Sequence, residues 1–210
     1  MRNERRDPDG RLVRLEADPA TFADVSEALE AGLVLTRRVV QLRIELPAAP
    51  ADASVITRPF RPGIDDTAFL RVNNRAFDWH PDQSGWTQAH LDERFAEPWF
   101  DPSGFLLHER DGEVAAFCWT KVHPANDIDP EIGEIYVIAV DPAFHGLGLG
   151  RAMTLAGLEH LAALGIEIGM LHVEHDNTAA CSLYADIGFE EHDAHCWWSL
   201  PETSDLESTR

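Results

Sequence analysis

The sequence predicts an α/β (α+β) fold, in which a mixed central sheet is flanked by helices and an N-terminal helix-strand appendage precedes the main domain. Two observations support this prediction. Apolar runs typical of strands are interspersed with stretches whose apolar residues recur at helical spacing. In addition, an Asp-Gly pair at 111–112 separates apolar runs at 105–110 and 113–122, which is typical of an antiparallel hairpin with a tight turn.

The remaining elements are expected in a regular order along the chain. Residues 21–31 should form a helix that ends at Gly32, because glycine is favoured just beyond a helix end. Further strands are expected at 33–46, 55–60, 135–140, 168–173 and 189–200. Further helices are expected at 65–77, at 87–96, in a stretch ending near Leu164, and at 178–186.

A stretch rich in proline and alanine is the clearest boundary in the sequence. The predicted parts are an appendage at 1–46, this linker at 47–53, the main domain at 54–201 and a flexible tail at 202–210. Segment 21–47 resembles segment 178–201 in its order of helix, glycine, strand and Leu-Pro. This similarity indicates a partial internal repeat, with chance similarity as the alternative.

Composition excludes several classes of partner. The chain has 37 acidic and 17 basic residues, a formal charge of −20, and such a field repels nucleic acid. No apolar run approaches the roughly 20 residues that span a bilayer, and the N-terminus lacks the apolar stretch of a secretory signal. We therefore expect a cytoplasmic protein that binds neither nucleic acid nor membrane. The sequence does not indicate an oligomeric state.

Cysteine and histidine spacing does not favour a metal site. Cys118, Cys181 and Cys196 form no CxxC motif and are expected to be free thiols. Two clusters contain possible ligands, at 172–175 and 192–196. In the second, strand alternation would place His192 and Cys196 on one face and His195 on the other, so we expect no metal.

The strongest motif is a glycine-rich turn between a predicted strand and a predicted helix. Residues 140–151 read Val-Asp-Pro-Ala-Phe-His-Gly-Leu-Gly-Leu-Gly-Arg. Glycines let the backbone approach a ligand closely, and a helix N-terminus favours anions, so the turn is suited to a pyrophosphate. A Rossmann dinucleotide site is the rival, but that motif belongs near the start of a βαβ unit. A glycine-rich loop without a ligand is the other alternative.

Several motifs together resemble those of the GNAT acetyltransferases, in order and spacing, over about residues 55–200. They are Asp141-Pro142, His145-x-x-Gly148-x-Gly150, Asp176-Asn177-x-x-Ala180 and Tyr184-x-x-x-Gly188-Phe189. The resemblance implies a GNAT fold and acetyl-CoA as co-substrate, without a metal. The cofactor-binding residues that it implies are Ile138, Ala139, Val140, His145, Gly146, Leu147, Gly148, Leu149, Gly150, Arg151, Asn177 and Phe189.

A narrower resemblance is to the C-terminal half of the mycothiol synthases, which are tandem GNAT proteins with the active acetyltransferase in that half. It is carried by residues 72–77, 80–83, 85–87, 97–102, 119–124 and 133–137. Segment 21–47 is similar to the end of the first GNAT half of these enzymes. The resemblance implies acetylation of a small-molecule amine, the cysteinyl amine of a cysteinyl-glucosaminyl-inositol. The substrate-binding residues that it implies are Asp82, Lys121, Glu134 and Tyr184.

The chain departs from this pattern at three places. His145 stands where the family usually has Gln or Arg, although backbone amides do most of the phosphate binding. Asp82 stands where the family has a glutamate that contacts the substrate, and its side chain is one methylene shorter. Near the end of the domain, residues 196–198 read Cys-Trp-Trp, where such enzymes often carry a tyrosine.

Glu134 is the candidate general base and Tyr184 the candidate general acid. Strand alternation predicts that Glu134, Tyr136, Ile138 and Val140 share one face. A carboxylate there can take a proton from an ammonium, and a phenol can protonate a departing thiolate. A backbone N–H near Ile138 is expected to meet the developing oxyanion.

Lys121, the only lysine of the chain, is the candidate donor to substrate hydroxyls. A solvent-exposed Glu134, a core Tyr184 and a solvated Lys121 are the alternatives to these roles. At the level of the whole chain, two other functions remain open. One is a GNAT enzyme for another amine, such as a protein N-terminus, an amino acid or an aminoglycoside. The other is a unit that binds acyl-CoA without catalysis.

Overall fold

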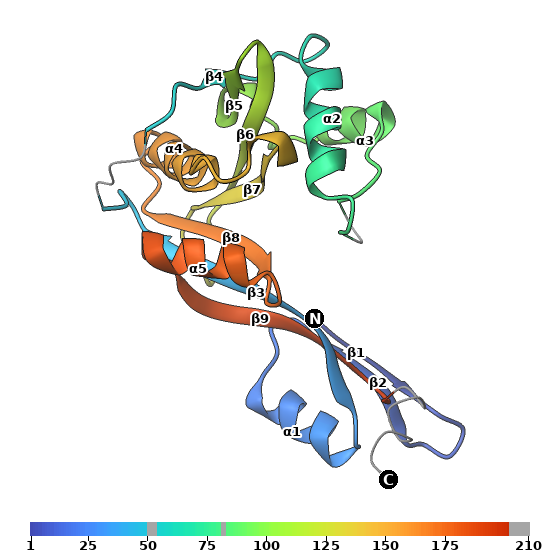
Figure 1. Ribbon diagram of the computed structural model, residues 1–210. Helices are drawn as coiled ribbons and strands as arrows, with labels where there is room; N and C mark the ends of the chain where they lie inside the picture. The colour runs from blue at the N-terminus through green and yellow to red at the C-terminus, as the bar shows by residue number, and fades with distance from the viewer. Residues whose placement is uncertain (50–53, 81–82, 202–210) are drawn as a thin grey trace. The chain divides into compact units, whose positions relative to one another are not determined.

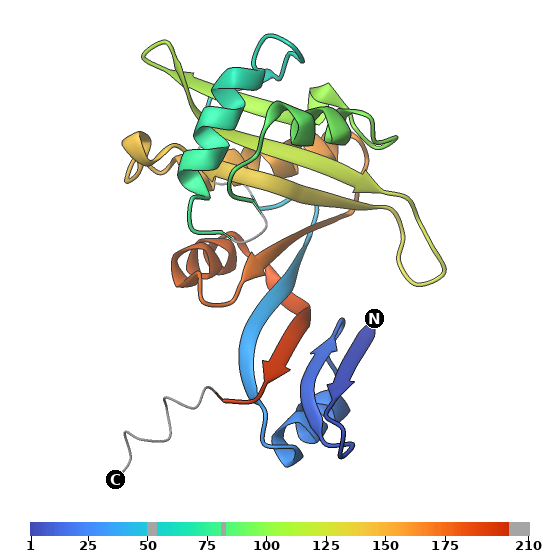
Figure 2. The ribbon, with the colours of Figure 1, turned by 90° about the vertical axis from the view of Figure 1, so that its right-hand side faces the viewer.

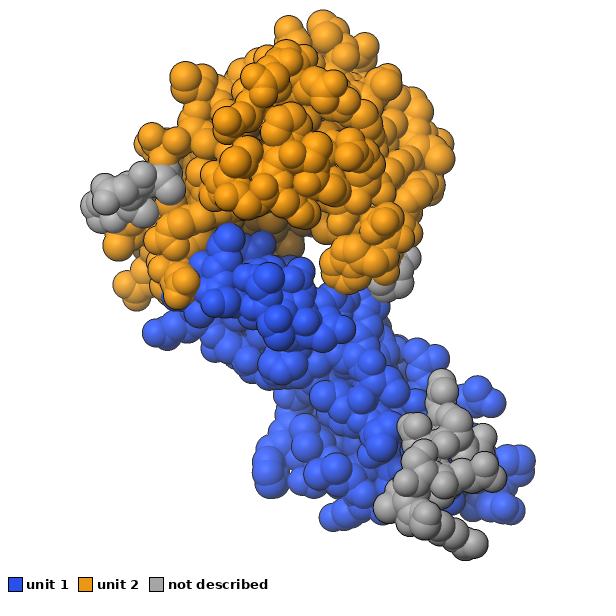
Figure 3. Space-filling view, in the orientation of Figure 1, with its two compact units in different colours: residues 1–42, 172–185, 189–210 blue, residues 43–171, 186–188 orange. Residues whose placement is uncertain are grey.

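The computed structural model of the chain describes residues 1–49, 54–80 and 83–201 (Figure 1). They form two compact units that interleave along the sequence (Figure 3). Unit 1 comprises residues 1–42, 172–185 and 189–210, and unit 2 comprises residues 43–171 and 186–188. Among the described helices, none is long and apolar enough to cross a membrane. Linker residues 50–53 and the tail 202–210 lie outside the described part, and the division of the chain at 47–53 stays a prediction.

Unit 2 is built on a mixed sheet. Its strands are β4 (Arg58–Pro59), β5 (Phe105–Arg110), β6 (Glu113–His123), β7 (Ile132–Val140) and the beginning of β8 (Ile168–Glu174). They lie in the order β4-β5-β6-β7-β8, and only β7 and β8 of this series are parallel (Figure 2). Asp111 and Gly112 connect β5 to β6 with φ of 55° and 81°. These positive angles are what a tight hairpin turn needs, and the predicted hairpin is confirmed.

Helices cover both faces of this sheet (Figures 1 and 2). On one face lie α2 (Asp66–Ala76) and α3 (Gln88–Phe95), and on the other lies α4 (Leu149–Ala163). The rings of Phe60, Phe105 and Trp119 stack in parallel under α2 and α3, with centroids 4.2 and 4.3 Å apart. Because aromatic side chains bury large apolar areas, this stack anchors the helices to the sheet.

A β-bulge in β7 changes which side chains share a face. Trp119 pairs with Val137 and Thr120 with Ile135, so Tyr136 is an extra residue in β7. Lys121 pairs with Glu134, on the α2 and α3 face. Beyond the bulge, Ile138 pairs with Cys118 and Val140 with Ala116, on the α4 face. The prediction that Glu134, Tyr136, Ile138 and Val140 share one face is therefore wrong for Ile138 and Val140, because the extra residue shifts the alternation.

Unit 1 combines the two ends of the chain. Its elements are β1 (Arg2–Arg6), β2 (Leu12–Ala17), α1 (Phe22–Glu30), most of β3 (Val34–Glu45), the end of β8, most of α5 (Thr178–Ile187) and β9 (Glu190–Ser199). Thr21 caps α1 in a capping box with Asp24, as its position before the helix indicates. The strand order is β1-β2-β9-β3-β8. The sequence analysis missed β1 and β2.

A strand-helix-strand arrangement occurs twice in unit 1. The first copy is β2-α1-β3 and the second is β8-α5-β9. The last strand of each copy lies next to the first strand of the other copy: β9 pairs with β2, and β3 lies next to β8. Thr36 Oγ1 also donates to the carbonyl of Trp197, which ties β3 to β9. The order of elements thus agrees with the similarity between segments 21–47 and 178–201.

The core of unit 1 is shared between the two ends of the chain. Leu15 is fully buried and belongs to a cluster with residues of α1 and with Trp198 of β9. We expect Leu15→Ala to lower the free energy of unfolding by about 2–5 kcal/mol, because it leaves a cavity in this cluster. Leu35→Ala on β3, where the side chain is 51% exposed, is the control. Urea denaturation measures both, and equal small effects would contradict the shared core.

Candidate active site

The glycine-rich turn leads from β7 into the N-terminus of α4. A short 3-10 helix, η2 (Pro142–Phe144), begins it, and Gly146 and Gly148 follow with φ of 78° and 73°. Gly148 is the N-cap of α4 and has no side chain that could cap the helix. No described atom lies within 4 Å of where a Cβ on either glycine would stand. The space beside these two glycines at the start of α4 is therefore open, as a site for an anion at a helix N-terminus requires.

Asp141 holds the start of this turn. Its carboxylate is almost fully buried, accepts from the backbone N–H of Ala143 at 2.9 Å, and lies 3.1 Å from Arg75 of α2. Nε2 of His145 lies 3.1 Å from the carbonyl oxygen of Val140. The side chain of His145 thus contacts the protein backbone, and the glycines and the helix end are the groups of the turn that could bind an anion. The residues present fit the pyrophosphate of acetyl-CoA.

Glu134 and His123 form a hydrogen-bonded pair on the α2 and α3 face. Oε2 of Glu134 lies 2.8 Å from Nε2 of His123, the last residue of β6. Glu134 is buried, with 10% of its side chain exposed, whereas 34% of the His123 side chain is exposed. The sequence analysis proposed Glu134 but not His123. His123 lies two residues after Lys121 on the same strand, so both side chains lie on one face. This spacing could have indicated His123 as a residue of the site.

Lys121 lies on the same face, above two aromatic rings. Its Nζ is 4.8 Å from the ring centre of Trp99 and 5.5 Å from that of Tyr136. The two rings are themselves 5.0 Å apart in an edge-to-face arrangement. Burial raises the pKa of the Tyr136 phenol, which therefore stays neutral. Cation–π contacts hold the ammonium in place without neutralising it, so Lys121 can donate to a ligand.

A pair of asparagines holds the loop between α2 and α3. Asn74 accepts from the backbone N–H of Trp86 and donates to its carbonyl, both at 2.8 Å. The adjacent Asn73 is fully buried and donates to the carbonyl of Gln83 at 3.1 Å. Asp82, a predicted substrate-binding residue of this loop, lies outside the described residues. Its role stays a prediction.

The remaining predicted residues belong to unit 1. The Tyr184 ring, on α5, is buried and lies 5.7 Å from that of Phe189. The side chain of Asn177 accepts from the N–H of Ala180 at 3.2 Å and so helps to begin α5. Of the histidines in the two clusters considered for metal, His195 lies 3.0 Å from Glu16 and His172 lies 3.3 Å from Gln41. Within the described part of the chain, no group of three or more His, Cys, Asp or Glu side chains is arranged to hold a metal.

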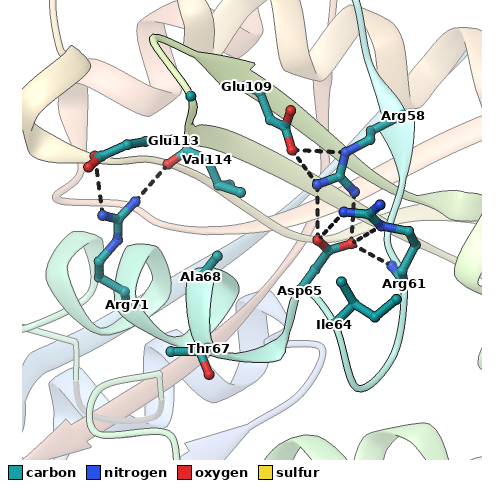
Figure 4. Close-up of a pocket in the computed structure, with 11 residues that line it drawn as sticks. Arg58, Arg61, Ile64, Asp65, Thr67, Ala68, Arg71, Glu109, Glu113 and Val114 are labelled. Carbon is teal, nitrogen blue, oxygen red and sulfur yellow. Dashed lines mark hydrogen bonds and ion pairs between the residues drawn. The ribbon is translucent and has the colours of Figure 1, made fainter.

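A separate pocket of about 510 Å³ opens between α2 and the β5–β6 hairpin (Figure 4). Arg58 and Arg61 both donate to Asp65, and Arg71 pairs with Glu113 at 3.2 Å. The hydrogen bonds from Arg61 and Arg58 hold the pKa of the Asp65 carboxyl well below its usual range. The guanidinium groups of this pocket are thus already paired with carboxylates of the protein. The contacts tie β4 to the start of α2.

The fold and the turn define the class of protein. Residues 72–189 match the model of the acetyltransferase (GNAT) family, and the chain belongs to this family. Among solved structures, a GCN5-related N-acetyltransferase from Sphaerobacter thermophilus has a TM-score of 0.66 at 20% identity, over 85% of this chain and 56% of that one. A tandem GNAT protein from the clavulanic acid biosynthesis pathway has a TM-score of 0.57 at 17% identity, over 94% of this chain and 62% of that one. These likenesses confirm the predicted fold class.

A curated relative is more similar in sequence. The chain is 50% identical over 169 residues to the mycothiol acetyltransferase of Mycobacteroides abscessus, an alignment that covers 78% of this chain and 56% of that protein. The chain spans 56% to 62% of the length of this and two further curated relatives that it matches. The resemblance to the GNAT acetyltransferases of mycothiol synthesis is thereby confirmed at the level of sequence.

Proposed function

We propose that this chain is an acetyl-CoA-dependent N-acetyltransferase that acetylates the cysteinyl amine of a cysteinyl-glucosaminyl-inositol, the precursor of mycothiol. The observation that carries the proposal is the cluster of Lys121, Glu134 and His123 on one face of β6 and β7. It combines a buried carboxylate for an ammonium with a cation for hydroxyl groups. The identity to mycothiol acetyltransferases supports the same substrate.

In this proposal each residue has a distinct task. Glu134 takes a proton from the substrate ammonium, so that the amine can attack the thioester. Tyr184 protonates the departing thiolate, for which a phenol is well matched. Lys121 and Asp82 hold hydroxyl groups of the sugar and inositol.

Acetyl-CoA would be held mainly by backbone. The N–H groups of the turn and the first turn of α4 would bind the pyrophosphate. The pantetheine arm would lie along β7 past the bulge. The cofactor-binding residues of the proposal are Ile138, Ala139, Val140, His145, Gly146, Leu147, Gly148, Leu149, Gly150, Arg151, Asn177 and Phe189.

We also propose that residues 1–46 are the tail of a preceding GNAT unit. The strand-helix-strand arrangement that occurs twice in unit 1 supports this proposal. So does the likeness to a tandem GNAT protein, which covers 94% of this chain. The first copy, β2-α1-β3, would then correspond to the end of one GNAT unit and β8-α5-β9 to the end of the next. A structure of a longer relative that contains this segment would test the correspondence.

Acetyl transfer to a panel of amines tests the proposed substrate. We expect the cysteinyl-glucosaminyl-inositol to have the highest kcat/KM, ahead of amino acids, peptides with a free N-terminus and aminoglycosides. A higher kcat/KM for one of those amines would mean that this amine, and not the cysteinyl-glucosaminyl-inositol, is the substrate. If the chain binds acetyl-CoA but transfers acetyl to no amine, the result would favour the alternative function, a unit that binds acyl-CoA without catalysis.

Removal of the Lys121 ammonium should weaken binding of the sugar-bearing substrate specifically. A hydrogen-bonding partner left unpaired typically costs about 1–3 kcal/mol, so Lys121→Ala should raise KM by roughly tenfold to a hundredfold. Lys121→Met is the matched variant, because it keeps an apolar stem over Trp99 and Tyr136 while removing the charge. Steady-state kinetics should show little change for a simple amine without the sugar. Equal losses for both amines would mean that the lysine supports the fold or the cofactor.

A further inference from the structure

The Glu134 carboxylate is buried, and the structure places a more exposed imidazole directly against it. The exposed fraction is 10% for the Glu134 side chain and 34% for that of His123, and 2.8 Å separates the two hydrogen-bonding atoms. The register explains the contact. Lys121 lies opposite Glu134, and His123, two residues further along β6, lies opposite Ile132 on the same face. The two side chains therefore meet diagonally across the strand pair.

A buried general base has to release the proton that it takes. Transfer of an acetyl group to a substrate ammonium produces an amide, a thiol and one proton for the solvent. The substrate nitrogen loses its first proton to Glu134 before it attacks, and its lone pair then forms the N–C bond while the C–S bond breaks. The second proton of the nitrogen replaces the one that Tyr184 gives to the thiolate. Glu134 must pass the first proton on before the next turnover.

Three titratable groups on this side of the sheet are poor acceptors for that proton, and the carboxylate of Glu97, which also acts on Tyr136, lies 3.9 Å from the Arg94 guanidinium. The Lys121 side chain offers hydrogen-bond donors and no acceptor. Burial raises the pKa of the Tyr136 phenol, which stays protonated. Arg94, which lowers this pKa through its charge, is a permanent cation. An imidazole, in contrast, accepts a proton at one ring nitrogen and releases one from the other near neutral pH.

We infer that His123 is a positioning residue for Glu134, which holds the carboxylate by a hydrogen bond and carries its proton to the solvent. The inference rests on the proposed function, because it presumes that Glu134 is the base. In the resting pair one proton lies between Nε2 of His123 and Oε2 of Glu134. When Glu134 gains a proton from the substrate, the pair holds two protons instead of one. The ring then exchanges through water to the tautomer protonated at Nδ1, its Nε2 accepts the carboxyl proton of Glu134, and Nδ1 releases its proton to water, which restores the resting pair.

The experiment compares His123→Ala and His123→Gln in the full chain, with the cysteinyl-glucosaminyl-inositol and acetyl-CoA at one pH. We expect His123→Ala to lower kcat by roughly tenfold to a hundredfold, the scale for outer hydrogen-bond partners of a functional side chain. KM for acetyl-CoA should not change. Added imidazole should restore the rate of His123→Ala in proportion to its concentration, because it fills the space and carries the proton. His123→Gln keeps an N–H donor but does not titrate, so it should stay slow and respond little to imidazole.

The exposed His192 on β9 supplies the control, because His192→Ala should behave as the wild type with and without imidazole. Melting temperature and calorimetric acetyl-CoA affinity show that the variants are folded, and His123→Gln carries the test if His123→Ala is not. Wild-type turnover in His123→Ala would overturn the inference and leave the proposed function intact. Slow variants without rescue by imidazole, or a fully active His123→Gln, would overturn the proton-carrying role. A wild-type chain that acetylates no amine would overturn the proposed function and this inference with it.

Discussion

Glu134→Gln is expected to lower kcat by roughly 10²-fold or more, the usual scale for loss of a general base. The amide has the shape of the carboxylate and keeps an oxygen that can accept from His123, so the hydrogen-bonded pair survives. What the variant loses is the ability to take a proton from the ammonium. Rapid-quench or steady-state measurement of acetyl transfer gives the change in kcat, and calorimetry should give an unchanged affinity for acetyl-CoA.

The matched control for this variant is Glu131→Gln. Glu131 is exposed and lies just before β7, so its replacement makes the same chemical change near the same strand. Activity near that of the wild type in Glu134→Gln would exclude Glu134 as the base. A loss of acetyl-CoA affinity as large as the loss of kcat would instead point to a structural role for the carboxylate.

Gly148→Asp is expected to abolish measurable acetyl-CoA binding. The residue caps α4 with a positive φ of 73°, and its backbone would face the pyrophosphate. Two unit charges about 4 Å apart repel by about 4 kcal/mol at an effective dielectric constant of about 20, which is roughly a thousandfold in Kd. Strain from a side chain in the left-handed region adds to this cost. Isothermal titration calorimetry measures the loss.

Gly165→Asp separates the two contributions. Gly165 follows the other end of α4, with a φ of 86° and no described atom within 4 Å of its Cβ position. The Gly165→Asp substitution therefore introduces the same charge and a similar backbone strain at a place away from the glycine-rich turn. We expect Gly165→Asp to lose stability and keep acetyl-CoA affinity. A folded Gly148→Asp variant that binds acetyl-CoA as the wild type does would rule out the turn as the pyrophosphate site.

Several elements of the fold were predictable from the sequence because they carry strong local signals. The Asp-Gly hairpin, the glycine after α1 and the glycine-rich turn each follow from backbone angles that few other residues adopt. β1 was missed because its residues 2–6 are all charged or polar and exposed, without the alternation of a half-buried strand. The short β2 was missed as well. Its buried Leu12, Leu15 and Ala17 pack in a cluster with residues of β9, a strand that lies far away in the sequence.

The candidate site was predictable in part. Lys121 and Glu134 stood out by residue type and by family resemblance, and they do lie opposite each other. The bulge at Tyr136 could not be predicted, because an extra residue in a strand depends on the register with its neighbour. Strand alternation places His123 on the face of Lys121, but its contact with Glu134 could not be predicted. It joins residues on different strands whose relative register only the fold determines.

The position of β3 sets the order in which unit 1 can assemble during synthesis. Its side chains reach partners that are made much later, since Thr36 bonds Trp197, 161 residues on, and Arg37 bonds Glu174, 137 residues on. Pairings of such long separation form slowly, and the ribosome releases these partners long after β3. Until β8 and β9 emerge, the nascent β3 has two open edges. We therefore expect a ribosome-bound chain arrested after residue 171 to hold a folded sheet from β4 to β7 and an N-terminal segment that proteases still cleave.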